Sequence, residues 1–145
     1  SQRTFCCYFQ CHKSSMIRRA RRSDVESLAT LDAQLFADDP LPPETFLQEV
    51  VAGFSWVVEE DKTVVGYAVA RFQDQMLDIL RLAVDPNYQG LGLGSRLLER
   101  ALRESPRAIL TVRKGNKVIS LYQKYGFRIV GDLGAAWVMT TSVGK

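Results

Sequence analysis

Three glycines alternate with leucines in the string QGLGLG at residues 89–94, which separates an apolar run at residues 76–84 from a stretch with helical spacing. Glycine loses more conformational freedom on folding than any other residue, so three of them in alternation indicate a structural requirement. A glycine-rich turn between a strand and a helix directs backbone N–H groups into one concavity, where the helix dipole adds partial positive charge. The segment therefore predicts a strand–turn–helix unit with an anion-binding turn.

The spacing of these glycines excludes two common nucleotide-binding motifs. A P-loop would need a second glycine at Ser95 and a lysine at Arg96. A dinucleotide fingerprint that began at Gly90 would also need glycine at Ser95, and one that began at Gly92 would need it at Leu97. Neither register fits, so the turn must bind its anion in another way.

The length and composition are typical of one globular domain. The chain has 145 residues, of which 46% are hydrophobic and 24% charged, and its formal net charge is +3. A chain of this size can bury a core without covalent staples. No apolar run approaches the roughly 20 residues of a membrane helix, so we expect no membrane partner. The mild positive charge fits an anionic small ligand as well as a nucleic acid.

All three cysteines and the only histidine lie in the first twelve residues, at Cys6, Cys7, Cys11 and His12. Structural zinc sites usually pair their ligands at other spacings, so we expect no metal. Residues 1–15 are expected to be a disordered extension or a cloning remnant, and residues 16–145 the folded domain. The body of the chain has no cysteine, which favours a cytoplasmic location.

Hydrophobic periodicity predicts an α/β fold. The expected strands are residues 16–20, 54–60, 63–72, 76–84, 108–113, 127–131 and 136–141. The expected helices are residues 23–36, 44–52, 95–104 and 117–125. Ser23 with Glu26 predicts a capping box for the first helix, and Asp61-Lys62 predicts a hairpin turn. The order βααβββαβαββ indicates a mixed sheet of about seven strands with four helices on its two faces.

Two motifs and this element order resemble the GCN5-related N-acetyltransferases (GNAT superfamily), and among them most of all the ribosomal-protein N-terminal acetyltransferases. The string QGLGLG is similar to the family's pyrophosphate loop, Q/R-x-x-G-x-G/A, and LYQKYGF at residues 121–127 is similar to its late L-Y-x-x-x-G-F segment. The resemblance covers residues 17–141. It implies the GNAT fold and acetyl-coenzyme A (acetyl-CoA) as co-substrate.

The resemblance also implies which residues bind the coenzyme. Backbone amides of the glycine turn would bind the pyrophosphate, and the end of the fourth strand, splayed from the fifth, would pair with the pantetheine arm. These residues are Leu82, Ala83, Val84, Gln89, Gly90, Leu91, Gly92, Leu93, Gly94, Ser95 and Asn116. Asn116 lies six residues before Tyr122, where the family usually has seven, and an ordinary helix N-cap is its alternative role.

The resemblance assigns Tyr122 as the acid that protonates the departing thiolate, the alternative being a core aromatic residue on an amphipathic helix. The resemblance identifies the general base less directly. Thr111 stands where the N-terminal acetyltransferases have a glutamate, and threonine cannot serve. Asp78, inside the apolar run, stands where the histone-acetylating branch has its glutamate. Asp78 is therefore either the base or a structural partner of Arg71 or Arg81.

The expected acceptor is a small-molecule amine or a protein N-terminal amine. An enzyme with a weak base tolerates an α-amine more easily than a lysine. Asp38, Asp39 and Glu44 form either an acidic rim that favours a cationic acceptor or an ordinary solvated loop. The short turn DLG at residues 132–134 leaves the acceptor side open. The oligomeric state, monomer or homodimer, is left open.

Two other classes of function compete with catalysis. A non-catalytic acyl-CoA sensor would explain Thr111 and the shifted Asn116. A nucleic-acid binder would use the arginines at positions 18, 19, 21 and 22, although a first strand leading into a helix explains these residues without a nucleic-acid partner.

Overall fold

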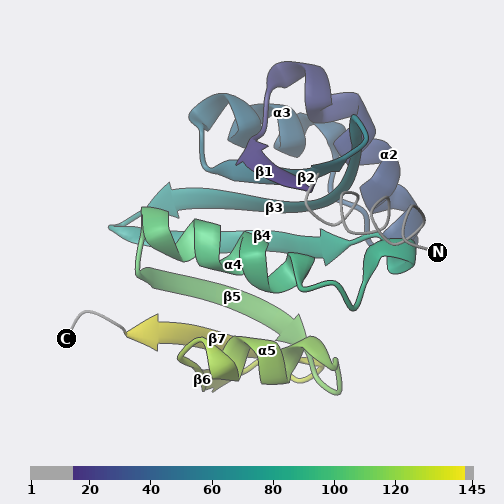
Figure 1. The fold of residues 1–145 in the computed structure, drawn as a ribbon. Coiled ribbons are helices and arrows are strands. Elements are labelled where there is room, and N and C mark those ends of the chain that lie inside the picture. Colours follow the sequence, from purple (N-terminus) through teal and green to yellow (C-terminus); the bar gives the residue numbers. More distant parts are fainter. Residues whose placement is uncertain (1–14, 143–145) are drawn as a thin grey trace, which may run out of the picture.

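Seven strands form one sheet in the computed structural model, which describes residues 15–142 (Figure 1). The strands are β1 Met16–Arg19, β2 Ser55–Glu60, β3 Thr63–Gln73, β4 Met76–Val84, β5 Arg107–Arg113, β6 Phe127–Asp132 and β7 Ala136–Ser142. The helices are α2 Val25–Leu35, α3 Pro43–Ala52, α4 Leu93–Glu104 and α5 Val118–Lys124, with short 3-10 turns η1 Arg22–Asp24 and η2 Pro86–Tyr88. The predicted order βααβββαβαββ and the mixed sheet are confirmed.

The spatial order of the strands is β1-β2-β3-β4-β5-β7-β6. Only β4 and β5 are parallel, and every other neighbouring pair is antiparallel. A parallel pair needs a crossover, which α4 provides. The carboxyl ends of β4 and β5 therefore lie at the same edge of the sheet, where both arrowheads point to the right in Figure 1.

Each face of the sheet has its own hydrophobic core. On one face α4 and α5 bury Leu97, Leu98 and Tyr122 against strand residues such as Trp56 and Met139. On the other face α2 and α3 bury Leu28, Leu31 and Phe46 with Val57 and Tyr67. The helical spacing of apolar residues in the sequence matches these two stripes. Helices on both faces hold β3 and β4 rigidly, and these strands support the site.

Local signals in the sequence account for the turns. Asp61 and Lys62 have φ angles of 49° and 65°, the left-handed pair that a two-residue hairpin requires. Gly53 ends α3 with a φ of 96°, where its N–H bonds to the carbonyls of Glu49 and Val50. The hairpin turn was predicted at these residues, and α3 ends at Ala52, where the predicted helix also ended.

The predicted capping box of Ser23 and Glu26 is wrong. The chain enters α2 through η1, and Asp24 stabilises this turn by accepting a hydrogen bond from the N–H of Arg21 at 2.7 Å. Ser23 is exposed. A buried aspartate with an arginine partner can satisfy the amide more strongly than an exposed hydroxyl, because a charged acceptor makes the stronger bond.

Candidate active site

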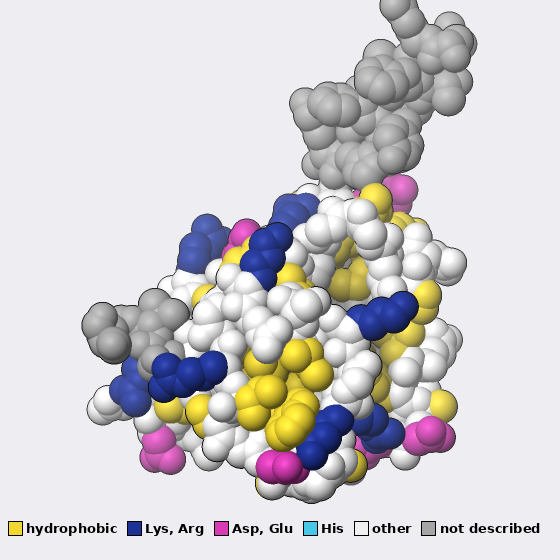
Figure 2. All heavy atoms as spheres, turned by 90° about the horizontal axis from the view of Figure 1, so that it is seen from below, with side chains coloured by type: hydrophobic (Ala, Val, Ile, Leu, Met, Phe, Trp, Pro, Cys, Tyr) yellow, Lys and Arg dark blue, Asp and Glu magenta, His cyan; other side chains and the backbone are white. Residues whose placement is uncertain are grey.

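The sheet forks between β4 and β5. The two strands pair only from Leu77–Ile79 to Ala108–Leu110, and no pairing joins the rest of β4 to β5. The fork is part of a cleft of about 1180 Å³ that runs from the glycine turn to the loop between α2 and α3. Figure 2, seen from the side of β6 and β7, shows a hollow with hydrophobic side chains in it and a basic side chain at its border. A split sheet exposes backbone groups along a strand edge, where an extended ligand can pair.

The glycine turn adopts the geometry that its sequence predicts. Gly90 and Gly92 have φ angles of 85° and 81°, in the left-handed region, and a Cβ at either would meet nothing within 4 Å. The glycines are therefore required by backbone conformation rather than by crowding. Helix α4 begins at Leu93, two residues before the predicted start, and its first intrahelical bond runs from the N–H of Arg96 to the carbonyl of Gly92. The preceding amides of the first turn have no intrahelical acceptor and suit an anion.

The residues assigned to the coenzyme lie together along this cleft. The cleft is lined by Leu82, Ala83, Val84, Gln89, Gly90, Gly92, Leu93, Gly94, Ser95, Asn116 and Tyr122. Leu91 does not line it and is 40% exposed. The Gln89 side chain donates a hydrogen bond to the carbonyl of Val84 at 3.0 Å, which ties the turn to the end of β4. These residues fit an extended ligand with an anionic end.

Asn116 lies one residue before the N-cap of α5, which is Lys117, and makes a capping-type hydrogen bond there. Its Oδ1 accepts a hydrogen bond from the N–H of Val118 at 2.9 Å, just before α5 begins. The residue is exposed and lines the cleft, so its amide N–H₂ remains directed to ligand or solvent. Helix capping and a ligand contact are therefore compatible in this side chain.

Tyr122 lies in the cleft and also packs in the core. The residue is 6% exposed, and its ring lies 5.6 Å from that of Phe127. Burial raises the pKa of the Tyr122 hydroxyl to about 12, so it is protonated at neutral pH. Within residues 15–142 the hydroxyl makes no hydrogen bond, so it is available to a group in the cleft.

Asp78 is not brought to the cleft. It lies opposite Arg71 across the β3–β4 ladder and opposite Ile109 on β5, and it does not line the cavity. Desolvation raises the pKa of Asp78, Arg71 opposes this shift and Glu49 adds to it. Arg71 is the cross-strand neighbour of Asp78, but it makes its ion pair with Glu49, at 2.7 Å. Both sequence-based alternatives for Asp78 therefore stay predictions. Its other suggested partner, Arg81, binds a different carboxylate.

Arg81 and Asp32 form a buried ion pair at the other end of the cleft, which sequence reasoning missed. Arg81 Nε and the Tyr67 hydroxyl donate to Asp32 Oδ1 at 2.9 and 2.6 Å. Arg81 Nη2 and the Leu41 N–H donate to Asp32 Oδ2 at 3.2 and 2.8 Å. The Asp32 side chain is 0% exposed, and a carboxylate has about four lone-pair sites, so this acceptor is fully used.

A sequence signal for Asp32 did exist. The residue follows Leu28 and Leu31 at helical spacing, on the stripe that faces the core. A charged residue on a buried stripe needs a partner of opposite charge. What the sequence did not reveal is which arginine supplies it.

The loop between α2 and α3 closes this end of the cleft. Phe36, Ala37, Asp38 and Asp39 line it, and the carboxylates of Asp38 and Asp39 are exposed. Opposite them the β6–β7 turn contributes only Ala135 and Ala136. The predicted acidic rim therefore lies at the cleft, with an open side facing it, whereas Glu44 does not line the cleft.

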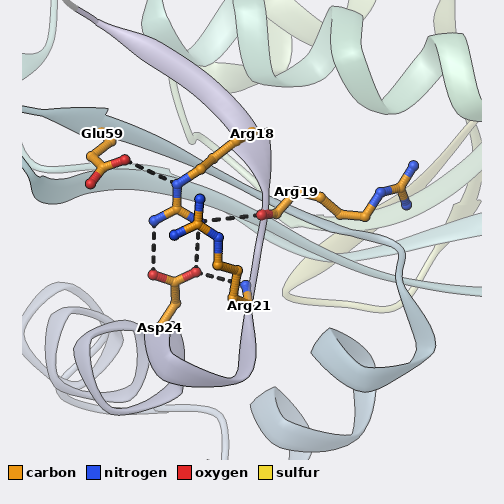
Figure 3. Close-up of polar contacts among 5 residues, drawn as sticks. All are labelled: Arg18, Arg19, Arg21, Asp24 and Glu59. Atoms are coloured by element: carbon orange, nitrogen blue, oxygen red, sulfur yellow. Dashed lines mark hydrogen bonds and ion pairs between the residues drawn. The ribbon is translucent and has the colours of Figure 1, made fainter.

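Two of the four arginines near the start of the chain, Arg18 and Arg19, make structural contacts, and Figure 3 shows those of Arg18. Arg18 binds both oxygens of Asp24 at 2.8 and 3.0 Å and Glu59 at 3.0 Å. Arg19 donates to the carbonyl of Gly53 and to Glu104. Hydrogen bonds from Arg18 hold the pKa of Asp24 below its usual range. These two side chains connect β1 to its neighbours, which weakens the nucleic-acid alternative.

Two features are absent from residues 15–142. No group of three or more His, Cys, Asp or Glu side chains in this part could hold a metal ion, and the Cys6–His12 cluster lies outside it. None of the helices described is long and apolar enough to cross a bilayer.

A forked sheet, an anion-binding helix start at the fork and a buried phenol beside it define a coenzyme-dependent acyltransferase. Residues 52–129 match the model of the acetyltransferase (GNAT) domain. The N-alpha-acetyltransferase RimI of Mycobacterium tuberculosis is 37% identical over 120 residues, 76% of each chain. The chain belongs to the GNAT acetyltransferases and is an acetyl-CoA-dependent N-acetyltransferase.

Two other similarities agree with this membership. The peptidyl-lysine N-acetyltransferase YjaB of Escherichia coli is 31% identical over 134 residues, which cover 81% of this chain and 88% of that one. Among solved structures, Arabidopsis thaliana Naa50 in complex with the bisubstrate analogue CoA-Ac-MVNAL superposes with a TM-score of 0.78. It is 21% identical and covers 89% of this chain and 99% of that chain, and at this identity the match shows the shared fold.

Proposed function

We propose that the protein transfers the acetyl group of acetyl-CoA to the α-amino group of a protein N-terminus. The choice of acceptor rests on which residues line the cleft at the fork between β4 and β5. Among the described residues, no carboxylate of β4 or β5 lines the cleft, and β5 presents Thr111 there. The relative with 37% identity is an N-alpha-acetyltransferase, which supports the same choice.

The pKa of the acceptor amine explains why the lining matters. Deprotonating a lysine ammonium with a pKa near 10.4 at pH 7 costs roughly 4.6 kcal/mol, against about 1.4 kcal/mol for an α-amine near 8. A site with no strong base in contact with the amine deprotonates an α-amine more readily than a lysine, because the free-energy cost is smaller. The cleft therefore favours an α-amine over the lysine acceptor named for YjaB.

The coenzyme fits the other end of the same cleft. Its pyrophosphate is placed at the amides of Leu93, Gly94 and Ser95, and its pantetheine arm along residues 82–84, with Asn116 beside it. The support is the left-handed glycine turn, the unpaired first-turn amides and the missing β4–β5 pairing. With the coenzyme placed in this way, the thioester lies at the fork.

Tyr122 supplies the proton that the leaving group needs. The neutral amine nitrogen forms a bond to the acetyl carbon, the carbon–sulfur bond breaks, and the Tyr122 hydroxyl donates its proton to the departing thiolate. The nitrogen then gives up its proton to water, and the Tyr122 phenolate regains a proton from water. A phenol with a pKa of about 12 stays protonated until the thiolate charge develops beside it. In this proposal Asp78, which does not line the cleft, takes no part in the transfer.

A coenzyme-release assay with two matched peptides tests the acceptor. One peptide begins with a free alanine and has no lysine, and the other has an acetylated N-terminus and one internal lysine. We expect thiol release and a mass increase of one acetyl group with the first peptide only. Preference for the lysine peptide would overturn the acceptor assignment. Coenzyme binding in calorimetry without release for any amine would instead identify the sensor.

A further inference from the structure

We propose that Arg81 is a positioning residue that fixes the acceptor loop, residues 36–42 between α2 and α3, and so determines acceptor binding while leaving coenzyme binding unaffected. This inference rests on the proposed function, because it assumes that the acceptor enters at the loop end of the cleft. It adds a residue on β4 that neither of the two acceptor predictions, the acidic rim or the open turn, had included.

A bulge in β4 directs Arg81 to this position. Val69 pairs with Arg81 and Ala70 with Ile79, so Leu80 has no partner of its own on β3. Ile79 and Leu82 both pack in the core under α4, although they are three positions apart. Strict alternation would place Arg81 on the α4 face together with Ile79. The extra residue turns Arg81 to the α2 face, which is a common effect of a bulge near an active site.

From that face Arg81 holds the acceptor loop at three points. Its Nη2 donates to the carbonyl of Asp39 at 2.6 Å, and its guanidinium lies 4.0 Å from the centre of the Phe36 ring. Through Asp32 it also fixes the carboxylate that accepts the Leu41 N–H at 2.8 Å. Between these points residues 37–40 are exposed, and their backbone makes one further bond, from Asp39 N–H to Phe36. The loop therefore depends on Arg81 for its position.

Arg81 itself lines the cleft, but most of its guanidinium is bound within the protein. Its side chain is 13% exposed, and its Nε and Nη2 are bonded to Asp32 and to the Asp39 carbonyl. The Asp32 carboxylate compensates its charge. Its effect on the acceptor is therefore indirect, through the Asp39 and Phe36 positions that line the cleft.

A second arginine on the same sheet provides a matched control. Arg71 on β3 binds Glu49 on α3 at 2.7 Å, and the Glu49 side chain is 3% exposed. This pair also joins the sheet to a helix through a buried carboxylate, but Arg71 does not touch the acceptor loop or line the cleft. Arg81→Lys and Arg71→Lys keep the charge and remove the planar guanidinium in each pair.

The experiment measures three quantities in the full chain for both variants. Hydrogen exchange follows the amides of Ala37, Asp38, Asp39 and Leu41. Calorimetry gives the Kd of acetyl-CoA, and steady-state kinetics gives KM for the alanine-initiated peptide. For Arg81→Lys we expect faster exchange in the loop, a peptide KM raised about tenfold or more, and an acetyl-CoA Kd within about twofold of the wild type. For Arg71→Lys all three quantities should match the wild type.

Several outcomes would overturn the proposal. These are unchanged loop exchange in Arg81→Lys, a parallel loss of acetyl-CoA affinity, or an equal effect of Arg71→Lys. If Arg81→Lys does not fold, the double variant Arg81→Met/Asp32→Leu removes both charges and leaves no buried charge unpaired. It also removes the acceptor of the Tyr67 hydroxyl and of the Leu41 N–H, so its loop exchange is measured at residues 37–39, with the same expectations. If the wild type acetylates no alanine peptide, the proposed acceptor is wrong, and loop exchange and coenzyme affinity alone decide the role of Arg81.

Discussion

The two ends of the cleft are built from different parts of the chain. At the coenzyme end the backbone forms the site: two left-handed glycines, the open amides of the α4 start and the edge of β4. At the acceptor end side chains form the site: Asp32, Arg81 and Tyr67 hold a loop whose backbone makes few bonds of its own.

This difference predicts different sensitivities. A backbone site depends on conformation, so it should tolerate most exchanges of side chains but not a residue that rejects a positive φ. A side-chain site depends on each partner, because the loss of one group leaves the others buried and unpaired. The separation of the two ends also lets residues at the acceptor end change without loss of coenzyme binding. This suits a family whose members differ in their acceptors.

Tyr122→Phe should give the largest effect, because this residue lies where the two ends meet. We expect kcat to fall about 10²- to 10⁴-fold, the usual contribution of a positioned acid, with the acetyl-CoA Kd unchanged. Tyr125→Phe is the matched control on the same helix, because the Tyr125 hydroxyl bonds to Glu99 at 2.6 Å and does not line the cleft. Equal turnover in the two variants would remove Tyr122 from the acid role.

Asp32→Ala tests the dependence of the acceptor end on single partners. The substitution leaves the Arg81 guanidinium, the Tyr67 hydroxyl and the Leu41 N–H without their acceptor. Breaking a buried ion pair typically costs about 3–5 kcal/mol, so urea denaturation should show a loss of that order in the free energy of unfolding. Asp38→Ala, exposed on the same loop, should change it by less than about 0.5 kcal/mol. A loss below about 1 kcal/mol for Asp32→Ala would show that this end does not depend on the network.

Gly92→Val tests the coenzyme end through backbone conformation. Holding an L-residue at a φ of 81° costs about 1–2 kcal/mol, so the acetyl-CoA Kd should rise about 5- to 30-fold as the turn relaxes. Gly94→Ala is the comparison. Its Cβ would meet Leu121 and Val84 at an ordinary 3.9 Å, so the free energy of unfolding should not fall. An equal Kd for Gly92→Val and the wild type would contradict a site made of left-handed amides.

The sequence predicted the glycine turn and the strand and helix that flank it because its signals are local. Glycines that need a positive φ, a hairpin pair such as Asp61-Lys62 and an apolar run leading into a helix all lie within a few residues of the structure they specify. The element order followed from the same kind of signal, and only the ends of the elements moved by a residue or two. The wrong prediction of a capping box at Ser23 fits this explanation. Asp24, and not Ser23, stabilises the turn, and its carboxylate is bound by Arg18, which lies on another element, β1.

The acceptor end could not be predicted in this way. Asp32 and Arg81 are 49 residues apart, and their pairing depends on the bulge at Leu80, for which the sequence has no glycine or other marker. Strict alternation assigns Arg81 to the wrong face of the sheet. Asp78 is a case in which a family position and the geometry differ. It matched a family position for a base, but the same alternation directs it away from the cleft and toward Arg71.

Asp78→Asn should give the smallest effect and completes the comparison, because it changes a charge that belongs to neither end. The fold raises the pKa of Asp78 by desolvation, so folding favours its protonated form. The stability that protonated Asp78 contributes is fully present below its pKa in the unfolded chain. It is lost as the pH rises through its pKa in the folded protein. At pH 7 the free energy of unfolding of Asp78→Asn should therefore equal or exceed that of the wild type, and the advantage should shrink toward pH 4. The pH profile of kcat/KM should superimpose on that of the wild type, whereas a shifted acidic limb would restore Asp78 as the base.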